Sequence, residues 1–249
     1  MSAQTPAPQA GDQIASGWHR FLKIARKELR WIIFAVAVIV FLALLEDVAE
    51  GEIMKLDTLA YTFAVAYLRN DALTPVMESI SDIASITSLA VLLLAIVAFA
   101  PGRRPGLCAT VNLALVIVLN QAIKFAVARP RPDGFRLVAE TGYSFPSGHS
   151  MVAMAFFGLL VWMVWHYGRN RFTRWFGAVG FSAVIALIGF SRVYLGVHYA
   201  SDVIAGFCIS LAWLAVFTRT IAPLLLAEKD DADTEGAQAE AEALGSGGE

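Results

Sequence analysis

The chain has 249 residues, of which 57% are hydrophobic and 16% charged, and its mean hydropathy is +0.62. This composition is too apolar for an ordinary soluble domain and indicates a protein that lies in a lipid bilayer. A large soluble helical bundle is the alternative, but runs such as 31–45 and 183–190 have no polar face for water. The net charge of −2 carries no signal for nucleic acid, which we do not expect as a partner.

Residues 1–29 form a polar, then basic, N-terminal segment. No small-residue cleavage site follows the first apolar run, so we expect the first span to remain as an anchor rather than to be removed as a signal peptide. Residues 227–249 are rich in Glu, Asp, Ala and Gly and cannot bury enough apolar surface to fold alone. We therefore expect a membrane domain over 30–226 followed by a disordered acidic tail.

Six apolar windows lie within the membrane domain. A helix that crosses the hydrocarbon core needs about 17–25 mostly apolar residues. The windows are about 30–48, 83–100, 107–128, 151–167, 176–190 and 203–226, and the fifth is the shortest and needs its flanks to span. The fold class predicted is therefore all-α, a polytopic bundle of six transmembrane helices.

Two short segments between the first two windows carry apolar residues at helical spacing. They cover 56–67 and 73–80, with Arg69-Asn70-Asp71 between them. The pattern predicts two short amphipathic helices at the membrane surface. Most of their residues are expected to pack on the bundle, and the alternative is that they help to form a lipid entrance.

Lysine and arginine orient the predicted spans, because these residues are in excess on the cytoplasmic side. A cytoplasmic N-terminus puts most of them inside: Arg20, Lys23, Arg26, Lys27, Arg30, Arg103, Arg104, Arg169, Arg171, Arg174, Arg219 and Lys229. Several tryptophans also fall near the predicted inner ends, as an interfacial belt would place them. We expect both termini in the cytoplasm.

The polar chemistry of the membrane domain is concentrated in three short motifs. They are Lys124-x6-Arg131-Pro132, Pro146-Ser147-Gly148-His149 and Ser191-Arg192-x5-His198-x3-Asp202. Counting spans from a cytoplasmic start brings all three to the outer membrane surface. The cysteines, Cys108 and Cys208, fall inside predicted spans and are expected to be buried apolar side chains.

The cations in these motifs are the kind of side chain that binds a phosphate group. Lys124, Arg131 and Arg192 would supply positive charge to the oxygens of a transferring phosphoryl group. Ser147 and Gly148 precede an apolar run, so their backbone N–H groups would begin a helix and add an anion site, although Ser147 could equally be only an N-cap. His198 and Asp202 are four residues apart, which places imidazole and carboxylate on one face of a helical turn.

Position for position, these motifs resemble those of the type 2 phosphatidic acid phosphatase superfamily, which includes membrane lipid phosphatases, soluble acid phosphatases and vanadium haloperoxidases. The resemblance implies that His198 is a nucleophile that becomes phosphohistidine and is oriented by Asp202. It implies that His149 protonates the leaving oxygen and then activates water. No metal or other cofactor is expected. The implied partner is a phosphorylated lipid in the bilayer, and the implied location is the bacterial inner membrane with the site at its periplasmic face.

Several activities fit this resemblance. The first is phosphatase action on undecaprenyl diphosphate, phosphatidylglycerophosphate or phosphatidate, and a phosphotransferase would share its first half-reaction. A vanadate-dependent haloperoxidase and a non-catalytic binder are further alternatives. Arg129 and Arg136 flank Arg131 outside the motifs, and are expected either to contact lipid headgroups or to reach the second phosphate of a diphosphate. The oligomeric state stays open.

Overall fold

The computed structural model describes residues 10–51, 53–100, 104–134, 136–168 and 170–226, with side chains from residue 29 onward. The first nine residues and the acidic tail lie outside this part. Every described element is helical, which confirms the predicted fold class. In chain order they are α1 (Ala10–Ala49), α2 (Lys55–Tyr61), the π-helical η1 (Thr62–Tyr67), α3 (Thr74–Asp82), α4 (Ile86–Phe99), α5 (Arg104–Val127), α6 (Gly148–Tyr167), α7 (Arg171–Tyr194) and α8 (Ala200–Leu226).

Five of these helices are long and apolar enough to cross a bilayer alone: residues 29–49 of α1, then α5, α6, α7 and α8. A sixth span is formed if α3 and α4, which meet at a bend of 52°, are counted together. The chain is therefore an integral membrane protein of the predicted architecture. The helix over the fifth window, α7, covers 24 residues and is therefore longer than the apolar run 176–190.

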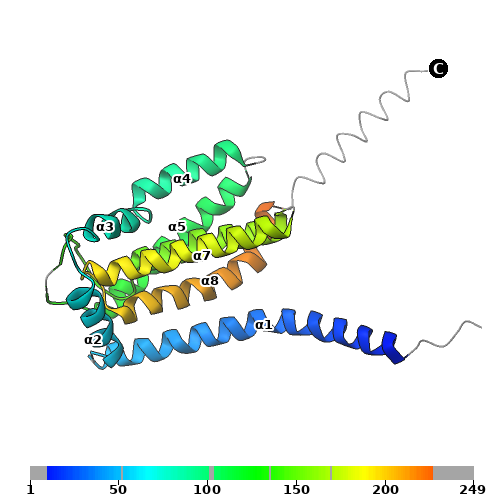
Figure 1. Ribbon diagram of the computed structural model, residues 1–249, viewed down its shortest axis with the longest axis horizontal. Coiled ribbons are helices and arrows are strands. Elements are labelled where there is room, and N and C mark those ends of the chain that lie inside the picture. Colours follow the sequence, from blue (N-terminus) through cyan, green and yellow to red (C-terminus); the bar gives the residue numbers. More distant parts are fainter. Residues whose placement is uncertain (1–9, 52, 101–103, 135, 169, 227–249) are drawn as a thin grey trace, which may run out of the picture.

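The second predicted surface helix is part of a broken span. Its residues form α3, which begins with Thr74 and Pro75. Helix α4 follows after a three-residue break. The first surface helix is observed as α2 and continues directly into η1. Both α2 and α3 lie at one end of the bundle (Figure 1), and that end carries the three motifs.

Helix α6 is the centre of the bundle and packs against α5, α7 and α8, while α1 packs along α8. Hydrogen bonds between buried or partly buried polar groups also join these helices. Asn112 on α5 donates to the Ala155 carbonyl of α6 (2.8 Å) and accepts from the Trp213 indole of α8 (2.9 Å). Such bonds fix the rotation of helices that share an apolar surface with lipid.

A small residue lets α8 approach the start of α6. A Cβ atom on Gly206 would stand 3.0 Å from the Ser147 carbonyl oxygen and 3.2 Å from Ser150 Cβ. The backbone of the second motif therefore rests directly on the helix that carries Asp202. This contact sets the distance between the second and third motifs.

Candidate active site

The turn between α7 and α8 carries His198. Helix α7 ends at Tyr194, and Gly196 follows in the left-handed region, with φ of +74°, a conformation that glycine adopts without strain. Asp202 stands in the first turn of α8, where its Oδ2 accepts from the Tyr199 backbone N–H at 2.9 Å. This local geometry brings His198 Nδ1 to 3.4 Å from Asp202 Oδ2.

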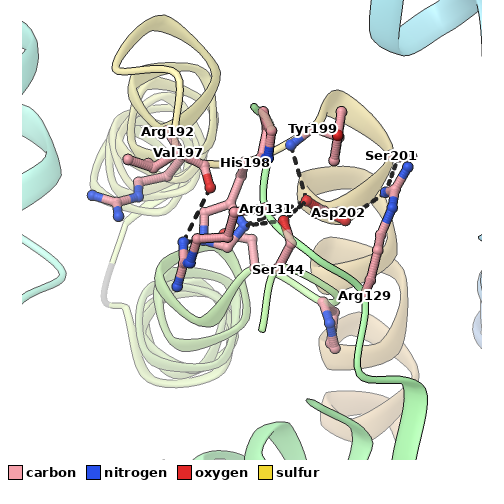
Figure 2. A network of polar contacts seen from close by, with 12 residues as sticks. Arg129, Arg131, Ser144, Arg192, Val197, His198, Tyr199, Ser201 and Asp202 are labelled. Atoms are coloured by element: carbon pink, nitrogen blue, oxygen red, sulfur yellow. Dashed lines mark hydrogen bonds and ion pairs between the residues drawn. The ribbon is translucent and has the colours of Figure 1, made fainter. Parts of the chain in front are cut away.

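Two side chains from the long loop between α5 and α6 also hold the Asp202 carboxylate. The Ser144 hydroxyl donates to Oδ2, and Arg129 Nη1 donates to Oδ1 at 2.6 Å. Asp202 is fully buried, so these donors replace the water that a carboxylate requires. Figure 2 shows Asp202 between the imidazole of His198 on one side and the guanidinium of Arg129 on the other.

Arg131 contacts the opposite edge of the His198 ring. Its Nη1 lies 3.2 Å from His198 Nε2 and donates to the Val197 carbonyl at 3.0 Å. A guanidinium only donates, so Nε2 must be the accepting nitrogen and the ring proton must lie on Nδ1, toward Asp202. Burial lowers the pKa of His198 to about 4, although Asp202 opposes the change. The ring is therefore neutral at physiological pH, with a lone pair on Nε2.

The second motif begins α6. Ser147 is the N-cap, and its hydroxyl accepts from the Ser150 hydroxyl at 2.9 Å. Its backbone N–H donates to the Asp202 backbone carbonyl at 3.0 Å, so Ser147 helps to hold the turn. Gly148 and His149 instead line the cavity of the site. Ser147 thus caps α6, and its contact with phosphate stays a prediction.

The three motif cations are all held by acceptors on other elements. The Lys124 ammonium donates to the Tyr143 carbonyl. Arg192 donates through Nη1 to Ser81 on α3 and through Nη2 to Glu140 in the loop before α6. Its buried Nε has no hydrogen-bond partner among the described residues. Arg192 thus retains a donor for a further acceptor.

Glu140 joins two of these cations. Its Oε2 lies 3.5 Å from Arg131 Nη2, while Oε1 accepts from Arg192. Burial alone would raise the pKa of Glu140, but the positive charges of Arg192 and Arg131 bring it below its usual value. An anionic carboxylate therefore spans two guanidinium groups, the arrangement that two oxygens of a phosphate would adopt.

A cavity of about 820 Å³ opens beside these groups. Its polar end is lined by Lys124, Arg131, Glu140, His149 and His198. Its apolar part runs between α4 and α5, where it is lined by Ile86, Leu89, Leu93, Leu113, Ile117 and Phe125. The cavity thus combines a cationic pocket with an apolar channel, and Asp202, Ser147 and Arg192 stand behind its wall.

Sequence reasoning missed several polar residues at this site. Ser144, Ser81 and Glu140 bond the motif side chains but belong to no motif. The expectation for Arg129 was wrong, while that for Arg136 stays a prediction. Arg129 is buried against Asp202, and Arg136 folds back to donate to the Pro132 carbonyl at 2.9–3.0 Å. Burial and pairing with Asp202 leave the Arg129 guanidinium unable to reach lipid headgroups, whereas Arg136 is exposed.

Fold and site together define a helical membrane protein with a cationic pocket at one bundle end. Residues 105–224 match the PAP2 superfamily. This part of the chain belongs to that superfamily, which confirms the resemblance carried by the motifs.

Relatives and solved structures place the chain with the membrane branch. It is 38% identical over 95 residues to phosphatidylglycerophosphatase B of Bacillus subtilis, covering 38% of this chain and 47% of that protein. Undecaprenyl-diphosphatase of Sulfolobus acidocaldarius is 28% identical, with 49% of this chain and 59% of that protein covered. The chain thus matches about half the length of these curated relatives.

The fold is similar to that of a solved structure, a transmembrane PAP2 type phosphatidylglycerolphosphate phosphatase from Bacillus subtilis. The two agree with a TM-score of 0.64 and 28% identity, covering 74% of this chain and 94% of the other. The similarity therefore extends over most of the membrane domain.

Proposed function

We propose that this protein is an integral membrane lipid phosphate phosphatase, which hydrolyses a phosphomonoester or diphosphate of a lipid through a phosphohistidine intermediate. The observation that carries the proposal is the pairing of His198, whose Nδ1 faces Asp202 at 3.4 Å and whose Nε2 faces the cationic cavity. The names of the relatives, a phosphatidylglycerophosphatase and an undecaprenyl-diphosphatase, support a lipid phosphate as substrate.

In the first half-reaction, His198 Nε2 attacks phosphorus and the bond to the lipid oxygen breaks. His149 donates a proton to the leaving oxygen, so that the lipid departs as an alcohol or a monophosphate. The imidazole ring gains positive charge as the P–N bond forms, and the Asp202 carboxylate next to Nδ1 stabilises that charge. The low pKa of His198 keeps Nε2 available for attack.

In the second half-reaction, His149, which lost its proton to the leaving oxygen, accepts a proton from a water molecule as that water attacks the phosphohistidine. The P–N bond breaks, inorganic phosphate leaves, and the lone pair returns to His198 Nε2. His149 thus acts first as acid and then as base, because the first step needs a proton donor and the second a proton acceptor.

Lys124, Arg131 and Arg192 form the phosphate-binding group in this proposal, with Gly148 at the helix start. A phosphoryl group spreads negative charge over its oxygens in the transition state, and fixed donors stabilise it without rearranging. The substrate must displace the Glu140 carboxylate from Arg192 and Arg131 to reach them. These cations supply the charge stabilisation, so we propose that no metal is required.

The apolar part of the cavity gives the lipid chain a path. It lies between α4 and α5, whose outward faces are apolar, so a chain could remain in the bilayer while the headgroup reaches His198. Undecaprenyl diphosphate, phosphatidylglycerophosphate and phosphatidate are the candidate substrates. We place the site at the outer, periplasmic face of the bacterial inner membrane, with both termini in the cytoplasm.

Phosphate release by the purified protein from a panel of these lipids, with and without EDTA, tests the proposal. We expect release from at least one lipid phosphate, unchanged by the chelator. Release that stops in EDTA and returns with magnesium would contradict the metal-free mechanism. No release, with phosphate passed to an added lipid alcohol, would identify a phosphotransferase instead.

A further inference from the structure

A buried charge network lies behind Asp202, on the side away from His198 (Figure 2). Arg129 donates to Asp202 Oδ1 at 2.6 Å, to the Ser201 hydroxyl at 2.8 Å and to Asp57 Oδ2 at 3.1 Å. Exposed fractions are 7% for Arg129, 2% for Asp57 and 0% for Asp202. One cation is therefore enclosed between two carboxylates.

Asp57 is also held by hydrogen bonds from Ser201. It lies on α2, and its Oδ1 accepts from the Ser201 backbone N–H at 2.8 Å while its Oδ2 accepts from the Ser201 hydroxyl at 2.8 Å. The guanidinium of Arg129 also lies 4.1 Å from the centre of the Tyr199 ring, a cation–π contact. The network thus joins the short surface helix to the start of α8.

The charge balance of this network determines what Asp202 presents to His198. With Asp57 ionised, the trio carries a net charge of −1, and Asp202 keeps its attraction for the Nδ1 proton. With Asp57 neutral, Arg129 and Asp202 would form a neutral pair, and the field of Asp202 at the imidazole would weaken. In a water-excluded site such a change is poorly screened.

We propose that Asp57 and Arg129 are positioning residues that set the charge and orientation of Asp202 and, through it, the tautomer and reactivity of His198. This rests on the proposed function, in which His198 attacks phosphorus. Helix α2 would then contribute to the site through Asp57 and not only pack on the bundle. Other charged or titratable groups act on the same ring, and they are Arg131, Arg192 and His149 directly, with Lys124 and Glu140 beyond them.

A double-mutant cycle tests the charge balance. Asp57→Asn should lower kcat by roughly tenfold to a hundredfold, with KM within about twofold, because phosphate contacts are untouched. Arg129→Gln leaves two buried carboxylates without their cation and should also lower kcat. The double variant restores the net charge of −1, so its kcat should exceed that of Asp57→Asn. A double variant no more active than Asp57→Asn would overturn the proposal.

Matched controls lie on the loop between α5 and α6, which also carries Arg129. Asp133→Asn and Arg136→Gln remove the same side-chain types from exposed positions and should leave kcat unchanged. If a single variant does not fold, as judged by gel filtration and thermal unfolding, Arg129→Lys replaces it. Lysine keeps the charge, so its kcat should lie well above that of Asp57→Asn, and equal losses would contradict the charge argument.

Nuclear magnetic resonance of ¹⁵N-histidine-labelled protein supplies a readout that needs no substrate. At neutral pH, His198 should show a protonated Nδ1 in the wild type, a loss of this preference in Asp57→Asn, and its return in the double variant. An unchanged tautomer in Asp57→Asn would overturn the proposal. If the tautomer responds but the wild type releases no phosphate from any lipid, the proposed function fails while the positioning role stands.

Discussion

His198 Nδ1 lies 3.4 Å from Asp202 Oδ2, and the Nε2 atom of the same ring lies 3.2 Å from Arg131 Nη1 at the edge of the cavity. The carboxylate therefore contacts the nitrogen that does not attack in the proposed mechanism. Such an arrangement separates the orienting contact from the reacting atom, which is what a histidine nucleophile requires.

Removing the nucleophile should abolish turnover. We expect His198→Ala to release no phosphate, because the proposed mechanism requires a bond between His198 Nε2 and phosphorus. Asp202→Asn should lower kcat severely, by roughly the 10⁴-fold that an orienting carboxylate contributes in a serine protease triad. Steady-state phosphate release measures both, and near-normal turnover by either folded variant would refute the assigned roles.

Glu140→Gln should strengthen anion binding. Its carboxylate bridges Arg131 and Arg192 and competes with an incoming phosphate, so neutralising it removes the competitor. Charge-assisted bonds are worth about 1.5–3 kcal/mol, so the inhibition constant for orthovanadate should fall by roughly tenfold or more. Inhibition curves measure this constant.

The half-buried Glu78 on α3, which does not line the cavity, serves as the control, since Glu78→Gln leaves the cavity unchanged. Weaker inhibition of Glu140→Gln by orthovanadate would show the opposite role, in which Glu140 holds the two arginines in place for phosphate.

His198 should make folding stability depend on pH. Its pKa is lowered by burial to about 4, below the value of about 6.5 for a free histidine. Between these values the unfolded chain binds a proton that the folded chain does not, so stability rises as pH increases from about 4 to about 6.5 and gains nothing further above that. Thermal unfolding in detergent measures it.

His198→Gln removes this titration while keeping a polar side chain. We expect its unfolding temperature to change less than that of the wild type over the same pH range. Identical pH profiles for the two proteins would show that the burial of His198 does not disfavour its protonated form.

A thiol-labelling experiment tests the predicted membrane topology. In a background where Cys108 and Cys208 are replaced by alanine, Asp133→Cys should react with a membrane-impermeant thiol reagent added outside intact cells. Arg171→Cys, at the opposite end of α7 from Arg192, should react only after the membrane is permeabilised. The reverse pattern would place the site on the cytoplasmic side and change the candidate substrates.

Much of the architecture could be predicted from apolar windows alone. A helix that crosses a bilayer must satisfy its own backbone and expose apolar side chains, so length and hydropathy suffice to locate it. The bend between α3 and α4 was not predicted, because the residues at the break, Ile83–Ser85, carry no Pro or Gly to mark it. Motif spacing likewise predicted the His198–Asp202 pair, since both lie within one helical turn.

The remaining site contacts depend on where the loop between α5 and α6 runs. Ser144 and Arg129 meet Asp202 across 58 and 73 residues of sequence, and Asp57 meets Ser201 across 144. No periodicity or local spacing encodes such pairs, because they arise only when separate helices pack and exclude water from polar groups. By itself, the sequence determined the membrane spans and the motif residues that meet at the site, whereas the tertiary structure decided which charges surround them.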